Sequence, residues 1–219
     1  GGRVSVCRFT RSTAGTAVFE DDSVRIWHQD DEVLILSLKT KMHVIGPGVI
    51  AGLATALAEA EKNYKGLVLW SADAAAGGAF SAGADLQAML PLFMSGGVKA
   101  IEPEVGRLQQ AHQAMKYASV PVVAAVSGLA LGGGCELMMH ASKRVASIES
   151  YVGLVEVGVG LIPAGGGLKE SAVRAAAETF ASSSPAASAV PDSSAPSDAS
   201  ASPAEPRGEV TPPFIPSAP

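Results

Sequence analysis

Two glutamates stand in apolar surroundings that are unusual for a carboxylate. Glu136 follows a run of three glycines after one intervening residue, Cys135, and Glu156 lies within the apolar segment 153–158 (GLVEVG). Burial among apolar neighbours is costly for a charge and raises the pKa of a carboxyl toward the range that a general acid or base needs. Two such carboxylates could hold one water molecule, one accepting a proton while the other donates one. The pair predicts acid–base chemistry, although a lone buried glutamate is more often a structural hydrogen-bond acceptor.

Two glycine-containing turns each follow an apolar segment. They are residues 80–86 (FSAGADL) and residues 128–136 (GLALGGGCE). Small residues let backbone N–H groups approach a ligand closely, and a helix that follows adds its positive dipole end. If the turns faced each other, they would place two N–H donors on one oxygen, which is an oxyanion hole. Either turn alone is explained as well by tight packing of a strand on a helix.

Several other chemistries fail on spacing. The glycines of 128–134 do not form the dinucleotide motif G-x-G-x-x-G, and residues 165–169 (GGGLK) lack the spacing and the Ser/Thr of a P-loop. The sequence has no G-x-S-x-G elbow of a serine hydrolase. Glu136 and His140 could share a helix face and a metal ion, but no third ligand lies in register. We therefore predict no metal site.

Composition restricts the partners and the compartment. The 16 Lys and Arg against 21 Asp and Glu give a net charge of −5, which does not favour nucleic acid as a partner. Two cysteines, Cys7 and Cys135, cannot build a disulfide framework and suit a reducing compartment. The longest uncharged stretch, residues 117–135, contains a proline and several glycines, so we expect no membrane span. These features predict a soluble, cytoplasmic protein.

Strand and helix patterns alternate through the middle of the chain. Apolar segments predict strands at residues 33–38, 67–70 and 122–126, and extended chain at residues 143–147. Apolar residues at helical spacing predict helices after Pro47 and before Pro121, and the glycines at 132–134 open a short third helix. This alternation indicates an α/β fold.

Composition also divides the chain into three regions. Residues 1–22 predict a flexible arm, residues 23–178 a folded domain, and residues 179–219 a disordered tail. Ala, Ser and Pro make up 28 of the 39 residues from 181 onward. A segment of this composition buries too little apolar area to offset the conformational entropy that it would lose on ordering. A solvated tail and a shifted reading frame both fit that composition. The basic, hydroxyl-rich start is also typical of a transit peptide, although we favour a linker.

Three segments in this order resemble the crotonase (enoyl-CoA hydratase/isomerase) superfamily. They are residues 80–86 (FSAGADL), 121–128 (PVVAAVSG) and 130–136 (ALGGGCE), and the likeness covers residues 24–170. Residues 39–43 (KTKMH) and 65–70 (KGLVLW) look more like the hydratase part of bacterial bifunctional β-oxidation proteins. In those proteins a 3-hydroxyacyl-CoA dehydrogenase part precedes the hydratase part, so the resemblance implies a fused or associated dehydrogenase.

The resemblance implies an α/β crotonase-like spiral of repeated ββα units, assembled as trimers or dimers of trimers. Family members continue beyond the equivalent of residues 167–170 through helices that complete the acyl pocket, contact CoA and form the trimer interface. Here an Ala/Ser/Pro-rich segment follows after Glu178. We therefore expect a C-terminally truncated domain that leaves apolar surface uncovered.

The resemblance also implies a mechanism. The N–H groups of Ala84 and Gly133 would hold a thioester enolate, Glu136 would accept a proton from water, and Glu156 would supply one to the α-carbon. The implied substrate-binding residues are Ala82, Gly83, Asp85, Leu86 and Gly132. The implied activity is an enoyl-CoA hydratase of fatty acid β-oxidation that converts trans-2-enoyl-CoA to 3-hydroxyacyl-CoA. It needs no cofactor, because CoA enters as part of the acyl-CoA substrate.

Two alternatives remain open. Relatives that isomerise double bonds often keep only the second carboxylate, so having both favours a hydratase. A catalytically silent fragment that binds acyl-CoA is the alternative of another class.

Overall fold

The structure is a computed structural model that describes residues 15–30, 32–71 and 78–183 of the 219. The chain divides into two units, residues 1–179 and 180–219. Of the second unit the structure describes residues 180–183, which end the last helix.

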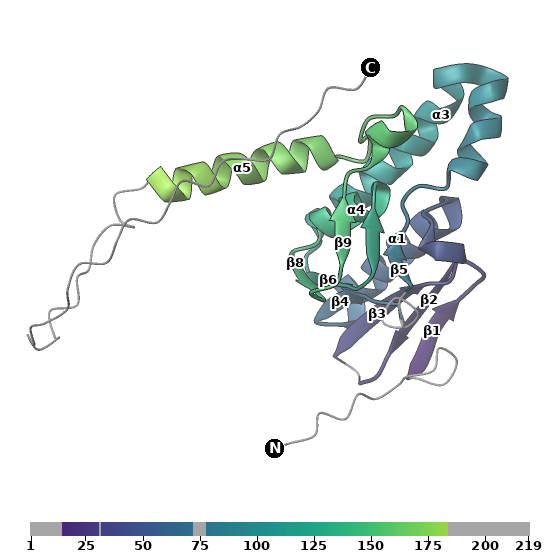
Figure 1. Cartoon of the computed structure of the whole chain (residues 1–219). Helices are drawn as coiled ribbons and strands as arrows, with labels where there is room; N and C mark the ends of the chain where they lie inside the picture. The colour runs from purple at the N-terminus through teal and green to yellow at the C-terminus, as the bar shows by residue number, and fades with distance from the viewer. Residues whose placement is uncertain (1–14, 31, 72–77, 184–219) are drawn as a thin grey trace, which may run out of the picture. The chain divides into compact units, whose positions relative to one another are not determined.

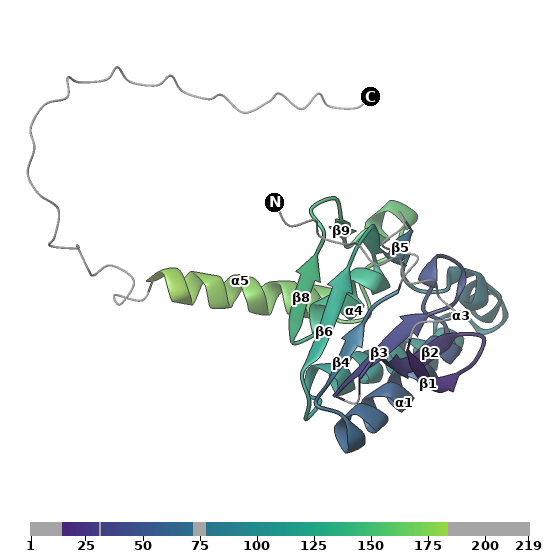
Figure 2. The same cartoon turned by 90° about the horizontal axis from the view of Figure 1, so that it is seen from below.

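Two sheets organise the described residues (Figure 1). The larger has six strands in the order β1-β2-β3-β4-β6-β8: β1 Thr16–Glu20, β2 Val24–His28, β3 Val33–Leu38, β4 Gly66–Leu69, β6 Val122–Val126 and β8 Lys143–Ala146. The first three strands pair antiparallel, and β3, β4, β6 and β8 pair parallel. Figure 2 shows β3, β4, β6 and β8 side by side. The interior strands are nearly all apolar because neighbours pair with both their edges and helices cover the sheet.

The smaller sheet determines where the functional turns lie. Its three parallel strands, in the order β5-β7-β9, are β5 Ala79–Ser81, β7 Leu129–Leu131 and β9 Tyr151–Gly153. Because neighbouring parallel strands end at the same edge of a sheet, the segments that follow them must also meet there. Those segments are the turn at residues 82–85, the start of helix α4 (Gly133–His140), and the segment that leads into the 3-10 helix η2 (Glu156–Val159).

Helices connect the parallel strands. Helix α1 (Pro47–Asn63) links β3 to β4 and buries an apolar stripe in the core with Val49, Leu53, Ala56, Leu57 and Ala60. Gly52 brings α1 close to β2, since a Cβ on Gly52 would lie 2.4 Å from a methyl group of Val24. Helix α3 (Leu86–Lys116) bends at Gly97, where φ is +61° (Figure 1). The bend divides α3 into two helical arms.

Most predicted elements are confirmed. The strands at residues 33–38, 67–70 and 122–126 are β3, β4 and β6, the extended segment at 143–147 contains β8, and α1, the second arm of α3 and α4 match the predicted helices. No helix among the described residues is long and apolar enough to cross a membrane.

Two predicted boundaries differ from the structure. Residues 16–20, inside the predicted arm, form β1, because they pair with β2 along most of its length. Helix α5 (Gly167–Ser183) continues past the predicted end of the domain at residue 178. The rest of the predicted arm up to residue 14 and the predicted tail from residue 184 lie outside the described residues.

Candidate active site

A cavity of about 300 Å³ lies where the segments after β5, β7 and β9 meet. Every residue predicted to bind substrate or act in catalysis lines it: Ala82, Gly83, Ala84, Asp85, Leu86, Gly132, Gly133, Glu136 and Glu156. The structure therefore brings together two sets of residues that lie about fifty to seventy positions apart in the chain. The parallel pairing of the small sheet is the physical reason, because it places the carboxyl ends of its strands side by side.

The backbone N–H groups of Ala84 and Gly133 lie next to each other. A Cβ on Gly133 would be 3.2 Å from the nitrogen of Ala84, and a Cβ on Gly83 would be 3.2 Å from the nitrogen of Gly133. Neither N–H donates a hydrogen bond to any residue in the described part of the chain. Two unpaired donors that face one cavity can bind one oxygen atom and stabilise negative charge on it.

Backbone hydrogen bonds hold the residues on both sides of the Ala84 donor. Ile45 donates to the carbonyl of Gly83 at 2.8 Å and accepts from the N–H of Asp85 at 3.0 Å, which leaves Ala84 between two anchored residues. Gly83 has φ of +102° and Gly132 has φ of +51°, values that favour glycine. Asp85 also caps α3 by accepting from the N–H of Ala88.

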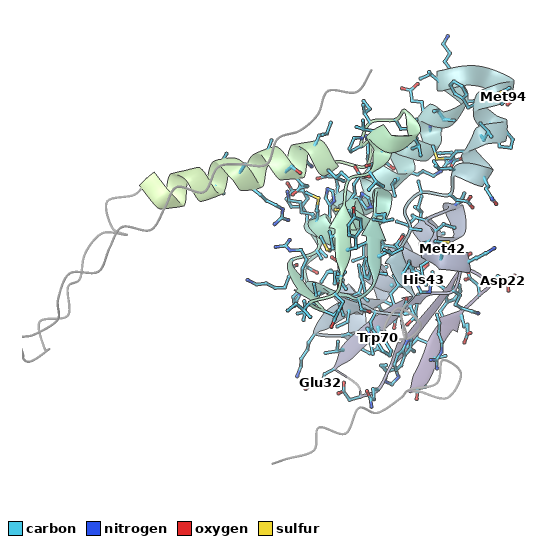
Figure 3. The ribbon with its side chains drawn as sticks, in the orientation of Figure 1. Asp22, Glu32, Met42, His43, Trp70 and Met94 are labelled. Atoms are coloured by element: carbon cyan, nitrogen blue, oxygen red, sulfur yellow. The ribbon has the colours of Figure 1, made fainter. Side chains whose placement is uncertain are left out.

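Residues before α1 hold the strand that leads into the turn at residues 82–85. The side chain of His43 donates from Nδ1 to the carbonyl of Ala79 at 2.6 Å, and the hydroxyl of Ser81 donates to the carbonyl of His43 at 2.7 Å. Figure 3 labels His43 and its neighbour Met42, both of which have positive φ. These contacts tie β5 to the 3-10 helix η1 (Lys41–His43) and so keep the turn rigid.

Glu136 is a buried carboxylate on the first turn of α4. It is only 2% exposed, and its Oε1 accepts a hydrogen bond from the N–H of Gly167 at 2.8 Å. Burial raises the pKa of Glu136, the nearby charge of Glu156 adds to the rise, and hydrogen bonds from the backbone of Gly167 and Gly165 offset part of it. A carboxyl with a raised pKa, at the wall of a cavity, is suited to proton transfer near neutral pH.

Glu156 begins η2 and faces the second glycine turn. Its Oε1 lies 3.3 Å from the position that a Cβ on Gly132 would take, so Gly132 leaves the space that this carboxylate approaches. Its Oε2 is buried and has no hydrogen-bond partner among the described residues. Both carboxylates therefore line the same cavity as the two free N–H groups.

The role of the glycines at 165–167 was not predicted from the sequence, where their spacing only excluded a phosphate-binding loop. The structure places them around the carboxylate of Glu136. A Cβ on Gly165 would lie 2.3 Å from Glu136 Oε2, and one on Gly167 would lie 3.0 Å from Oε1. A buried glutamate needs hydrogen-bond donors, and glycines let backbone N–H groups approach it closely. The glycine run at 165–167 was therefore the signal in the sequence that could have indicated these donors.

The apolar wall of the cavity was also missed. It comes from α1 and both arms of α3, and it includes Ile50, Met89, Leu92, Val105 and Leu108. One charged residue, Glu104, stands among them and pairs with Arg107. The apolar spacing of α3 predicted the helix, but not that part of this apolar stripe would face a cavity rather than the core.

The chain belongs to the enoyl-CoA hydratase/isomerase family, whose model matches residues 32–184. A Bacillus subtilis protein named "Probable 3-hydroxyacyl-CoA dehydrogenase" is 40% identical over 140 residues, which are 64% of this chain and 17% of that protein. The rice "Peroxisomal fatty acid beta-oxidation multifunctional protein" is 33% identical over 140 residues, which are 63% of this chain and 18% of that protein. The matched stretch thus spans about a fifth of these relatives.

Solved structures agree on the fold. An enoyl-CoA hydratase from Polaromonas sp. JS666 superimposes with a TM-score of 0.61 at 26% identity, covering 67% of this chain and 56% of that one. An enoyl-CoA hydratase from Bacillus anthracis has a TM-score of 0.60 at 24% identity, covering 68% of this chain and 56% of that one. The predicted crotonase-like α/β fold is therefore confirmed.

Proposed function

We propose that this chain carries an enoyl-CoA hydratase site, which adds water to a trans-2-enoyl-CoA to give a 3-hydroxyacyl-CoA. The observation that supports it most is the meeting of two carboxylates and two unpaired backbone N–H groups on one largely apolar cavity. An isomerase needs one carboxylate to move a proton, whereas hydration needs one group to activate water and one to protonate carbon. The pair favours hydration.

In this mechanism the thioester oxygen accepts hydrogen bonds from the N–H groups of Ala84 and Gly133. Water lies between Glu136 and Glu156, and Glu136 accepts its proton as the water oxygen bonds to the β-carbon. The electron pair of the double bond moves toward the thioester, so negative charge develops on the oxygen that the two N–H groups hold. Glu156 then donates a proton to the α-carbon, which completes the addition of one water molecule. The proton that Glu136 took from water passes to Glu156, so both carboxyl groups return to their starting states.

The cavity wall supports an acyl-thioester as substrate. Its apolar side chains from α3 suit a hydrocarbon chain, and its polar groups gather at the glycine turns where the reacting atoms would lie. CoA would enter with the substrate, so the proposal assigns no separate cofactor.

The names of the relatives support a partner activity. One is named a 3-hydroxyacyl-CoA dehydrogenase and another a β-oxidation multifunctional protein. A dehydrogenase of that class would consume the proposed product, so we place this site beside such an activity, fused or associated, in fatty acid β-oxidation. A trimer-based homo-oligomer is part of the same proposal by family resemblance.

The first experiment follows the loss of conjugated enoyl-thioester absorbance when the purified chain meets crotonyl-CoA. Glu136→Gln and Glu156→Gln should each lower turnover about 10²–10⁴-fold, because each removes one proton-transfer group. Glu149→Gln is the matched control, since Glu149 is exposed in the turn between β8 and β9. Circular dichroism should show all four proteins folded.

The alternatives give different results. An isomerase that relies on Glu156 would keep most of its activity in Glu136→Gln, measured on a 3-enoyl-CoA. A folded chain that turns over neither substrate would favour a silent acyl-CoA-binding fragment.

A further inference from the structure

One face of α3 holds the loop that surrounds Glu136. The side chain of Gln109 donates to the carbonyl of Ala164 at 2.6 Å, and His112 donates from Nδ1 to the carbonyl of Gly165 at 2.8 Å. One turn further on, Lys116 donates to Glu170 Oε1 at 2.6 Å. Spacings of three and four residues place these side chains on the same helix face.

The held loop carries the donor to the proposed catalytic base. Gly167 gives its N–H to Glu136 Oε1, two residues after the carbonyl that His112 holds. Gly165 lies between the two side chains: a Cβ there would be 2.3 Å from Glu136 Oε2 and 3.1 Å from His112 Cε1. The ring of His112 therefore supports the loop directly behind the carboxylate.

A second histidine, His140, contacts the backbone of Glu136 itself. His140 donates from Nδ1 to the backbone carbonyl of Glu136 at 2.7 Å. Its ring stacks on that of His112, with centroids 4.8 Å apart and planes 20° apart. Both rings are fully buried, so the stack sets the spacing between α4, which carries Glu136, and the loop of Gly165 and Gly167.

The chemistry of His112 suits a fixed donor better than a proton carrier. Burial lowers the pKa of His112 to about 4, so the ring is neutral near pH 7. A carbonyl can only accept, so the single ring proton lies on Nδ1. Nε2 is buried without a hydrogen-bond partner among the described residues, and those residues contain no cluster of three metal-ligating side chains. These facts leave His112 one polar contact, the carbonyl of Gly165.

We propose that His112 is a positioning residue: its Nδ1–H holds the carbonyl of Gly165 so that the N–H of Gly167 stays on Glu136 and orients this carboxylate toward the cavity. The proposal deepens the hydratase assignment and rests on it for the role of Glu136 as base. His112 itself lies outside the cavity lining, so it acts through the loop and not on substrate.

Several titratable groups surround Glu136 and bear on the pH dependence. Glu156 faces it from η2, while His112 on α3 and His140 on α4 lie behind it. At the start of α5, Glu170 is paired with Lys116 and Lys169. Loss of the Gly167 hydrogen bond would raise the pKa of Glu136, because that bond favours the ionised carboxylate. Activity requires ionised Glu136, so the acid limb of the pH–rate profile would move to higher pH.

Two substitutions separate hydrogen bonding from packing. His112→Phe keeps an aromatic ring but removes the donor, while His112→Asn loses the ring but keeps an amide N–H near the position of Nδ1. We expect His112→Phe to lower kcat for crotonyl-CoA hydration about tenfold or more, with little change in KM, and to shift the acid limb upward. We expect His112→Asn to be less stable than His112→Phe and yet closer to the unsubstituted chain in kcat and in pH profile.

Met115→Val is the control for lost stability, because Met115 is buried on the same helix and belongs to the apolar core. It should lower the melting temperature and leave the acid limb in place. If His112→Phe and Met115→Val gave the same profile, or if His112→Asn were as impaired as His112→Phe, the proposal would be wrong.

Amide hydrogen exchange tests the proposal without turnover. Residues 164–170 should exchange faster in His112→Phe than in His112→Asn, with α1 unchanged in both. Absence of hydration by the unsubstituted chain would overturn the proposed function alone, whereas equal exchange in the two variants would overturn the role of His112.

Discussion

The two glutamates of the site belong to regions built in different ways. In α4, which carries Glu136, six of the eight residues are buried. In η2, which begins with Glu156, no residue is buried, and Val157 is 77% exposed. One carboxylate therefore belongs to a buried helix at the cavity wall, while the other depends on a short surface segment.

The difference extends beyond the helices themselves. Glu136 is held by the loop at 165–167, which α3 anchors through Gln109 and His112. The region from β8 to just past η2, residues 143–162, instead presents exposed large apolar side chains: Val145, Ile148, Tyr151, Val157, Val159, Leu161 and Ile162. Geometry at Glu136 is thus built into the described domain, whereas geometry at Glu156 rests mainly on backbone hydrogen bonds in its own turn.

Among changes that leave both carboxylates in place, the largest effect is expected from adding one methyl group beside Glu136. In Gly165→Ala the new Cβ would lie 2.3 Å from Glu136 Oε2, so the carboxylate or the loop must move. We expect hydratase turnover to fall about a hundredfold or more, because a displacement of about 1 Å misplaces the base. The rate of crotonyl-CoA hydration measures it.

Gly158→Ala is the matched change in the region of Glu156. Nothing lies within 4 Å of a Cβ at Gly158, so turnover should stay within about twofold. Equal losses in the two alanine variants would contradict the contrast between the regions.

A smaller effect concerns stability. The pKa of Glu136 is raised by burial and by the charge of Glu156, so its ionisation destabilises the folded state. Glu136→Gln should therefore raise the melting temperature at pH 7 by about 2–4 °C, which corresponds to about 1 kcal/mol. The gain should vanish below the pKa of an unfolded glutamate and grow as pH rises through the raised folded-state pKa.

Thermal melts of both proteins from pH 4 to pH 8 provide the measurement. A Glu136→Gln protein that melts lower than the unsubstituted chain at pH 7 would show that the charge is stabilising.

The smallest effect reports on both carboxylates at once. Burial and the charges of Glu156 and Glu136 raise the pKa of the Cys135 thiol to about 11, so this buried thiol should react slowly with iodoacetamide at pH 8. Each Glu→Gln substitution should speed its alkylation severalfold at most. Mass spectrometry of the peptide that contains Cys135 gives the rate, and fast alkylation in the unsubstituted chain would mean that α4 opens readily.

Much of the fold could be predicted from local patterns. The apolar run at 33–38 predicted β3, Pro47 and the apolar spacing after it predicted α1, and the glycines at 132–134 marked the start of α4. The sequence motifs also indicated the family. The pairing of residues 16–20 with β2 escaped prediction, because it depends on neighbours in space. The kink of α3 at Gly97 was not predicted either, although the adjacent glycines 96 and 97 are a local signal for it.

The sequence by itself determined the kinds of groups available: two carboxylates in apolar segments, and two turns small enough to expose their N–H groups. Only the tertiary structure decided that Ala84 and Gly133 are adjacent, and that His112 reaches Gly165, a partner 53 positions away. The physical reason is that local preference depends on residues a few positions apart. Contacts between residues far apart in the chain are instead determined by parallel strand pairing and helix packing across the whole domain.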